Sequence, residues 1–473
     1  MQFNSIEFLI FLPIVFLLYW SMHKSIKAQN ILIVAVSYIF YGWWNVKFLF
    51  LIALTSFLSY FSGVLIARTR FIANNSDERL TPKMLMLGNV IINLLILGVF
   101  KYYNFFIDNL VDLFAVFGIH LHITSLYLIL PVGISFYTFQ ALSYTIDVYK
   151  GRICATHDIV AFFAYVSFFP QLVAGPIERA TNLLPQFLIR RTFCYDKAVD
   201  GMRQILWGFF MKIVIADNCA GIVNVIFEHY DKAHWVMLVM GAIMFAFQIY
   251  GDFAGYSNIA IGCARLFGFE LLENFRTPYF SHNIPEFWRR WHISLNTWFR
   301  DYVYIPLGGN RRGRLRQTIN TFIVFALSGL WHGANWTYVA WGLWHGVFAS
   351  LYKKGRDSSN KGFMIGVTFV LVTIGWILFR SDSVVQAIEY LGGICSLQNG
   401  WGISEFGFSY IQTFVTLGFI IILLLCEYMT QEKAFPLSLM PCNRILRWGL
   451  YLFIVMLLFL FPGKSETFIY FQF

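Results

Sequence analysis

Charged side chains are scarce in this sequence. Asp, Glu, Lys and Arg make up only 13% of its 473 residues, whereas soluble domains carry roughly a quarter. That shortage argues against a water-soluble globule. The seven cysteines are scattered, odd in number and form no CxxC pair, so they indicate neither a disulfide framework nor a zinc site. Walker A, GxGxxG and HxxxxD sequences are also missing, which argues against a nucleotide site and a peripheral acyltransferase.

Long apolar runs are abundant instead. Hydrophobic residues make up 58% of the chain, and about 17 to 25 consecutive apolar residues suffice to cross a bilayer. We therefore predict an all-α polytopic membrane protein. The net charge of +10 is expected to serve topology rather than nucleic-acid binding, because basic residues concentrate in cytoplasmic loops. The clear runs are Ile31–Val46, Phe48–Ala67, Met84–Phe100, Ile123–Ile146, Ile159–Ile177, Trp235–Tyr250, Phe363–Phe379, Phe406–Cys426 and Trp448–Phe461, with weaker ones at Phe8–Trp20 and at Ile205–Phe227, which Lys212 interrupts.

Basic clusters alternate with the first helices and predict an external N-terminus. The alternation fails at Ile159–Ile177, which has basic residues at both ends and contains Pro170 and Pro176. Two interpretations remain open for this segment. It either enters and leaves on one side, which is tolerated where backbone is buried in protein, or it crosses as a proline-kinked helix.

The stretch Gln317–Tyr352 breaks the alternation again. It carries no charge, yet arginines precede it and Lys353, Lys354 and Arg356 follow it. One straight helix would be about 54 Å long, against a hydrocarbon core of about 30 Å. We therefore predict two arms, with a break near Gly329 and Gly333 at the sequence WHGAN.

The tetrapeptide Leu-Trp-His-Gly occurs twice in this stretch, at His332 and at His345. On one helix the two imidazoles would lie about 20 Å and 140° apart, so we expect only one of them to carry chemistry. The predicted break places His332 deep in the membrane. His345 is expected to be a hydrogen-bonded structural residue of the second arm.

The arginine-rich segment Asn283–Arg316 predicts a helix in or under the cytoplasmic interface. Pro285 suits a first helical position, and apolar residues then recur at helical spacing. His292 belongs to that stripe, so it is either a functional imidazole or a hydrogen-bonded core residue. The stripe consists of Trp288, Trp291, His292, Leu295, Trp298, Phe299 and Tyr302.

Asp252 lies upstream, within FQIYGDFAGYSNIAIG near a membrane end. Ionisable groups inside membrane segments are costly and favour a functional interpretation. Structural pairing with an arginine is the alternative.

These segments also carry a family resemblance. The sequences FWRRWHISLNTWFRDYVYIPLGGNRRG and SGLWHGANWTYVAWGLWHG resemble the membrane-bound O-acyltransferase (MBOAT) family, in its branch of alginate O-acetylase-like polysaccharide O-acetyltransferases. The N-terminal 20 residues, FPQLVAGPIER and the Asp252 region are similar to the same branch. The resemblance implies a ring of about ten to twelve tilted transmembrane helices with re-entrant segments. It also implies a single integral-membrane domain over residues 1–473, with its catalytic core at about 130–350.

The resemblance also implies the site. The family's essential histidine falls on His332 and its second functional histidine on His292. Residues that would support substrate binding are Trp331, Asn335, Trp291, Arg289, Asp301 and Asp252. No bound cofactor or metal is expected. His332 would act as a general base or as a transient acyl acceptor, and either role requires neutral imidazole.

The implied reaction moves an acetyl group from a cytoplasmic thioester, acetyl-CoA or another, toward hydroxyls of an exported or cell-wall polysaccharide. The implied partners are a separate extracytoplasmic acetyltransferase and membrane lipid, in a bacterial cytoplasmic (inner) membrane. A D-alanyl, lipid or protein O-acyltransferase of the same superfamily is the enzyme alternative. A secondary transporter is the non-enzyme alternative, but no internal repeat of the kind such proteins show is apparent.

Overall fold

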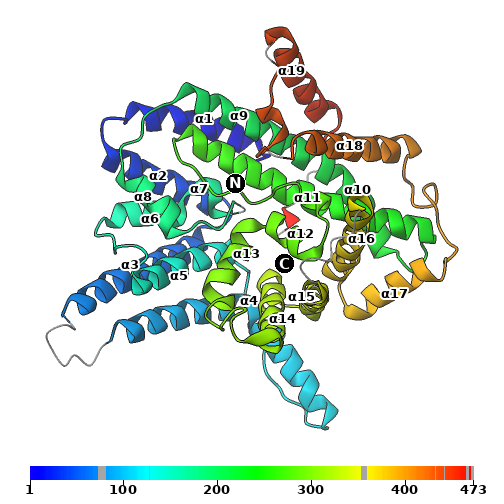
Figure 1. The fold of residues 1–473 in the computed structure, drawn as a ribbon, viewed down its shortest axis with the longest axis horizontal. Coiled ribbons are helices and arrows are strands. Elements are labelled where there is room, and N and C mark those ends of the chain that lie inside the picture. Colours follow the sequence, from blue (N-terminus) through cyan, green and yellow to red (C-terminus); the bar gives the residue numbers. More distant parts are fainter. Residues whose placement is uncertain are drawn as a thin grey trace. The chain divides into compact units, whose positions relative to one another are not determined.

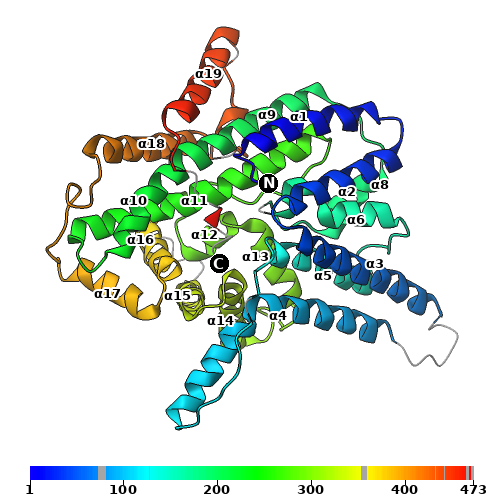
Figure 2. The ribbon, with the colours of Figure 1, turned by 180° about the vertical axis from the view of Figure 1, so that it is seen from behind.

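The structure is a computed structural model, and it describes residues 1–473 except 73–80, 127, 174, 353–359, 432, 442, 465–467 and 470–473. Lys353, Lys354 and Arg356, the basic residues that follow the predicted second arm, lie outside the described residues. The regular secondary structure of the described residues is helical, apart from one isolated bridge between Ala233 and Trp401 (Figures 1 and 2).

Nineteen α-helices and five short 3₁₀ or π segments follow one another in the described residues. The α-helices are α1 (Ile6–Ser21), α2 (Ile26–Gly42), α3 (Leu49–Ile72), α4 (Pro82–Val116), α5 (Ile134–Lys150), α6 (Ile159–Ser167), α7 (Phe169–Leu172), α8 (Ala180–Leu188), α9 (Tyr195–Phe209), α10 (Asp217–Glu228), α11 (Trp235–Leu266), α12 (Ile284–Arg290), α13 (Ile293–Phe299), α14 (Gly313–His332), α15 (Trp336–Leu351), α16 (Lys361–Arg380), α17 (Val384–Cys395), α18 (Tyr410–Met429) and α19 (Arg444–Leu460). The short segments are η1 (Val46–Phe48), η2 (Phe210–Ala216), η3 (Pro278–Phe280), η4 (Arg300–Tyr304) and η5 (Pro436–Ser438).

Among the residues that the structure describes, six helical stretches are long and apolar enough to cross a membrane. They are Val46–Phe71, Pro82–Val116, Tyr195–Glu228, Trp235–Leu266, Lys361–Arg380 and Tyr410–Met429, and the shorter α1, α2 and α17 are also apolar. These spans confirm the predicted all-α polytopic membrane protein. One predicted crossing, Ile123–Ile146, starts later than expected. Its helix begins only at Ile134, after Pro131 and a left-handed Gly133, because proline and a positive φ interrupt a regular helix.

The chain forms two compact units. Unit 1 comprises Met1–Gly201 with Cys263–Leu272, and unit 2 comprises Met202–Gly262 with Glu273–Phe473. Within unit 1, α3 packs on α4 and α5, and α2 packs on α6.

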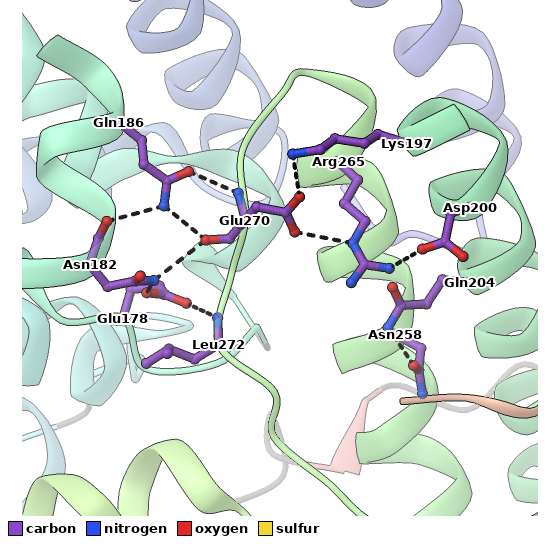
Figure 3. A network of polar contacts seen from close by, with 10 residues as sticks. All are labelled: Glu178, Asn182, Gln186, Lys197, Asp200, Gln204, Asn258, Arg265, Glu270 and Leu272. Carbon is purple, nitrogen blue, oxygen red and sulfur yellow. Dashed lines mark hydrogen bonds and ion pairs between the residues drawn. The ribbon is translucent and has the colours of Figure 1, made fainter. Parts of the chain in front are cut away.

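A polar network in unit 1 fastens the segment that follows α11. The buried Glu178 carboxylate accepts hydrogen bonds from the backbone N–H of Leu272 and from the Asn182 amide, at 2.5 and 2.8 Å. The Gln186 side chain both donates to and accepts from the backbone of Glu270, and the Glu270 carboxylate pairs with Lys197 and Arg265 (Figure 3). Burial raises the pKa of Glu178 to about 7.

The segment Ile159–Ile177 is broken rather than straight. Helix α6 ends at Ser167, and α7 begins at Phe169 with Pro170 in its first turn. Nine residues of α6 extend only about 14 Å at 1.5 Å per residue, which is too short to cross a bilayer. The segment is thus interrupted directly before Pro170, as both the re-entrant path and the proline-kinked crossing require.

The predicted two-armed stretch is a helical hairpin in unit 2. Helix α14 ends at His332, and α15 starts at Trp336 (Figures 1 and 2). The break therefore lies at 333–335 and confirms the predicted division. Gly329 has a different role from the one expected, because it lies inside α14. A Cβ there would come within 2.2 Å of the Tyr338 carbonyl oxygen, so glycine allows the two arms to touch backbone to backbone.

Candidate active site

His292 lies at a break in the arginine-rich segment. One continuous helix was predicted here, but α12 ends at Arg290 and α13 begins at Ile293. His292 adopts a left-handed backbone with φ of 45°, which is rare for a residue other than glycine. The Asn296 amide lies 2.8 and 2.5 Å from the carbonyl oxygens of Trp288 and Trp291. This side chain replaces the helical donors that those carbonyls would otherwise need, which explains why the continuous-helix prediction was wrong.

The His292 imidazole is enclosed by protein. Its exposed fraction is 1%, and burial lowers its pKa to about 3. The ring is therefore neutral near pH 7. Its Nδ1 lies 3.0 Å from Oδ1 of Asn274, and the Phe253 ring meets it edge-on at 4.6 Å between centroids.

His332 is the last residue of α14, at the apex of the hairpin. Its exposed fraction is 3%. The rings of Trp331, Trp341 and Phe379 surround it at centroid distances of 5.0, 5.1 and 5.4 Å. The apex is thus a buried aromatic environment rather than an exposed turn.

The structure brings the two candidate histidines together. The centroids of His292 and His332 lie 6.5 Å apart, although His292 lies between α12 and α13 and His332 ends α14. Trp331 contacts both imidazoles, at 5.9 Å from His292 and 5.0 Å from His332. Trp291, directly before His292, is buried and packs on Trp376 at 4.9 Å. The site therefore consists of two neighbouring imidazoles that are enclosed by tryptophan rings.

His345 occupies a different environment. Its exposed fraction is 0%, and neither ring nitrogen has a hydrogen-bond partner among the described residues. The expectation of a hydrogen-bonded imidazole was therefore wrong. The ring fills an aromatic cage instead, with Trp288 at 5.0 Å and Trp341 at 5.3 Å. Hairpin formation places these aromatic faces around it.

Asp252 belongs to a buried ion-pair cluster. Nζ of Lys212 lies 2.7 Å from Asp252 and 2.8 Å from Asp217, with all three side chains nearly inaccessible. The Asp252 carboxylate also accepts a hydrogen bond from the backbone N–H of Ile469 at 2.7 Å. The partner is thus the lysine that interrupts an apolar run and not an arginine. Asp252 adjoins the site through its neighbour Phe253, whose ring packs on His292.

The remaining predicted residues lie outside the pair of histidines. The Asn335 side-chain oxygen caps α15 by accepting from the N–H of Thr337, and its amide nitrogen donates to the backbone carbonyl of Asp382, so the side chain joins the hairpin apex to the segment after α16. Arg289 is exposed. Asp301 pairs with its neighbour Arg300 at 2.8 Å.

An open cavity lies beside the site in unit 2, and its space of about 330 Å³ includes open solvent. Its walls include Phe275, which stacks on His292 at 6.5 Å, and Tyr250. The Tyr250 hydroxyl donates to the buried Glu427 carboxylate at 2.5 Å. Two exposed basic residues, Arg276 and Lys433, also line it. The cavity lining thus combines two basic side chains and Glu427 with the aromatic Phe275, whose ring lies beside His292.

Several residues of this region carried no signal in the sequence. Asn274 lies in an unremarkable connection between α11 and α12, and Glu427 ends an apolar run. In the described part of the chain, no group of three or more His, Cys, Asp or Glu residues is arranged to hold a metal ion. The fold and site define a polytopic helical membrane protein with two adjacent buried imidazoles, an arrangement suited to proton transfer or to nucleophilic chemistry.

Sequence comparisons identify the family. The sequence pattern of the membrane-bound O-acyltransferase family matches residues 152–356, which include both histidines. The chain is 40% identical to the probable alginate O-acetylase of Pseudomonas aeruginosa over 86% of its own length and 76% of that relative. It is 34% identical to the peptidoglycan O-acetyltransferase of Helicobacter pylori, over 82% and 78% of the two chains.

A third relative, the teichoic acid D-alanyltransferase of Bacillus subtilis, is 30% identical over 52% of this chain and 68% of its own. The chain belongs to the membrane-bound O-acyltransferase family, as its motifs predicted. It is a multi-pass membrane O-acyltransferase.

Proposed function

We propose that this protein moves an acetyl group from a cytoplasmic thioester across a bacterial inner membrane, toward hydroxyls of an exported or cell-wall polysaccharide. The observation that carries the proposal is the 6.5 Å approach of His292 and His332 inside the segment that matches the family. The whole chain acts as one integral-membrane domain, with its catalytic core at about 130–350. Support for acetyl transfer comes from the similarity to two O-acetyltransferases over more than four-fifths of this chain.

His332 is the residue that performs the transfer in this proposal. It acts as the general base for the acceptor hydroxyl or is itself transiently acylated, and both roles need a neutral imidazole. His292 holds the donor or the acceptor beside it. Trp331 contacts both rings and limits how the reacting carbonyl lies between them.

The open cavity is the proposed entry for the donor. A thioester of coenzyme A or of a carrier protein ends in a phosphate-bearing arm, and Arg276 and Lys433 supply cations where that phosphate would lie. Phe275, which lines the cavity, stacks on His292 and so connects the cavity to the histidine pair. Arg276 lies seven residues before the arginine-rich segment Asn283–Arg316, which its composition places at the cytoplasmic interface.

Sealed vesicles of known orientation test the direction of transfer. Acetyl-CoA supplied at the face that carries Arg276 should be consumed, and acetyl-CoA at the opposite face should not react. Equal turnover from both faces would refute the proposal. A D-alanyl thioester on a carrier protein, offered in parallel, would identify the alternative reaction if it alone is consumed.

The Arg276→Gln variant tests the entry itself. It should raise KM for acetyl-CoA while leaving kcat nearly unchanged, because the arginine binds the same phosphate before and during the reaction. Arg300→Gln is the matched control, since Arg300 is exposed and pairs with Asp301. Equal KM values in both variants would contradict the entry through this cavity.

Delivery to the polysaccharide is proposed to need an extracytoplasmic partner protein. We place the segment Arg380–Glu405 on the external side as the longest connection there. It contains the 12-residue helix α17, which offers little surface to bind a glycan. Purified protein with acetyl-CoA and polysaccharide should therefore form little acetylated glycan until the partner is added. Full glycan acetylation by the chain alone would refute the need for a partner.

A further inference from the structure

We propose that Asn274 is a positioning residue that holds His292 with its proton on Nδ1 and its basic lone pair on Nε2. This inference rests on the proposed function, in which His292 acts beside His332. The inference assigns a role to Asn274, which lies outside the sequence motifs that contain His292 and His332.

The hydrogen bonds around Asn274 fix which end of its amide faces His292. Oδ1 accepts from the backbone N–H of Ser294 at 3.4 Å and from its hydroxyl at 2.8 Å. Nδ2 donates to Oγ of Ser257 at 3.1 Å. A backbone N–H can only donate, so the atom it meets is the carbonyl oxygen. His292 Nδ1, 3.0 Å from the same oxygen, must therefore carry a hydrogen.

A neutral imidazole with a hydrogen on Nδ1 has its lone pair on Nε2. The Asn274 contact thus decides which nitrogen of His292 can accept a proton or a hydrogen bond from a substrate. The same contact also prevents rotation of the ring. The triad of serine hydrolases follows the same logic, because a carboxylate there keeps the histidine in its working tautomer.

The backbone strengthens this arrangement on both sides of His292. The N–H of Ile293 donates to the backbone carbonyl of Asn274 at 2.9 Å. The N–H of Arg276 donates to the backbone carbonyl of Arg290, also at 2.9 Å. These two bonds bracket the left-handed residue His292, whose conformation persists only where its surroundings hold it. Asn274, Ser257 and Ser294 have exposed fractions of 1 to 2%, so no bulk water competes for the contact.

Two substitutions at Asn274 separate positioning from packing. Asn274→Leu keeps the branched shape of the side chain but removes the acceptor, and it should lower kcat with acetyl-CoA by about 10-fold to 100-fold, the effect of losing an outer partner of a metal-binding histidine. Asn274→Asp keeps an acceptor oxygen and should retain much more activity. Ser257→Ala is the control, because it removes a partner of Nδ2 and leaves the Oδ1 contact to His292 intact.

The double variant of Asn274→Leu with His292→Ala provides the decisive measurement. If Asn274 works through His292, the double variant should be no slower than His292→Ala alone, since coupled residues are not additive. Each variant is compared as monodisperse protein of matched thermal stability.

The outcomes separate this inference from the function it rests on. Additive losses, or equal losses for Asn274→Leu and Asn274→Asp in folded protein, would overturn the positioning role. A fully active Asn274→Leu variant beside an inactive His292→Ala variant would overturn it as well. An active His292→Ala variant, or a parent protein inert toward acetyl-CoA, would count against the proposed function instead.

Discussion

Replacing His345 with leucine should leave this acyltransferase folded and active, whereas the same replacement at His332 should abolish transfer. Both imidazoles are buried and both contact Trp341, so burial alone does not distinguish them. Their environments do. His332 lies beside His292 at the hairpin apex, and His345 lies in an aromatic cage with no hydrogen-bond partner for its nitrogens among the described residues.

The expected magnitudes follow from those environments. A buried polar group without a partner costs about 1–3 kcal/mol, and leucine at position 345 removes that cost while it fills most of the ring's volume. His345→Leu should therefore change the free energy of unfolding by less than about 1 kcal/mol, or stabilise the protein. His345→Ala leaves space inside the cage and should cost about 2–4 kcal/mol, as large-to-small changes do. At His332, loss of a general base should cost about 10² to 10⁴ in rate.

The assay is acyl transfer per amount of membrane-extracted, monodisperse protein, with thermal unfolding of each variant measured in parallel. His332→Leu should unfold near the temperature of the parent protein and show no transfer. An inactive, well-folded His345→Leu variant beside an active His332→Leu variant would show that the other imidazole performs the chemistry. The assignment of the apex histidine would then be wrong.

Three further predictions concern stability. Lys212→Met leaves Asp217 and Asp252 as buried carboxylates without their lysine and should destabilise the protein by about 3–5 kcal/mol. Lys197→Met, which removes an exposed ion pair, should cost at most about 1 kcal/mol, and equal melting temperatures for the two variants would contradict the buried cluster. Gly329→Ala should separate the arms of the hairpin, because its Cβ would meet the Tyr338 carbonyl at 2.2 Å, and a normal yield of active, monodisperse protein would contradict that contact. The pKa of Glu178 is raised to about 7, so its contribution to stability is complete below pH of about 4.5 and is lost as pH rises through about 7. The parent protein should therefore lose stability between these values relative to Glu178→Gln, and parallel pH profiles for the two would refute the buried carboxylic acid.

The sequence by itself determined the class of protein and the division of its central stretch. The chain has few charges and many apolar runs, and so many apolar side chains find a favourable environment only in a bilayer. The length of Gln317–Tyr352 excluded a single crossing, and the structure places the break directly after His332. These features depend on composition and on distance along one helix, which a sequence contains in full.

Only the tertiary structure decided which polar groups meet. Asn274 and His292 are 18 positions apart and do not share a helix, so helical spacing could not predict their contact. Lys212 and Asp252 lie on different helices whose crossing brings a lysine to a carboxylate. The continuous helix expected over Asn283–Arg316 also failed at this level, because the Asn296 amide captures the carbonyl groups that a helix would have used. Apolar periodicity records which face of a segment is buried, but it carries no information about which distant donor or acceptor that face will meet.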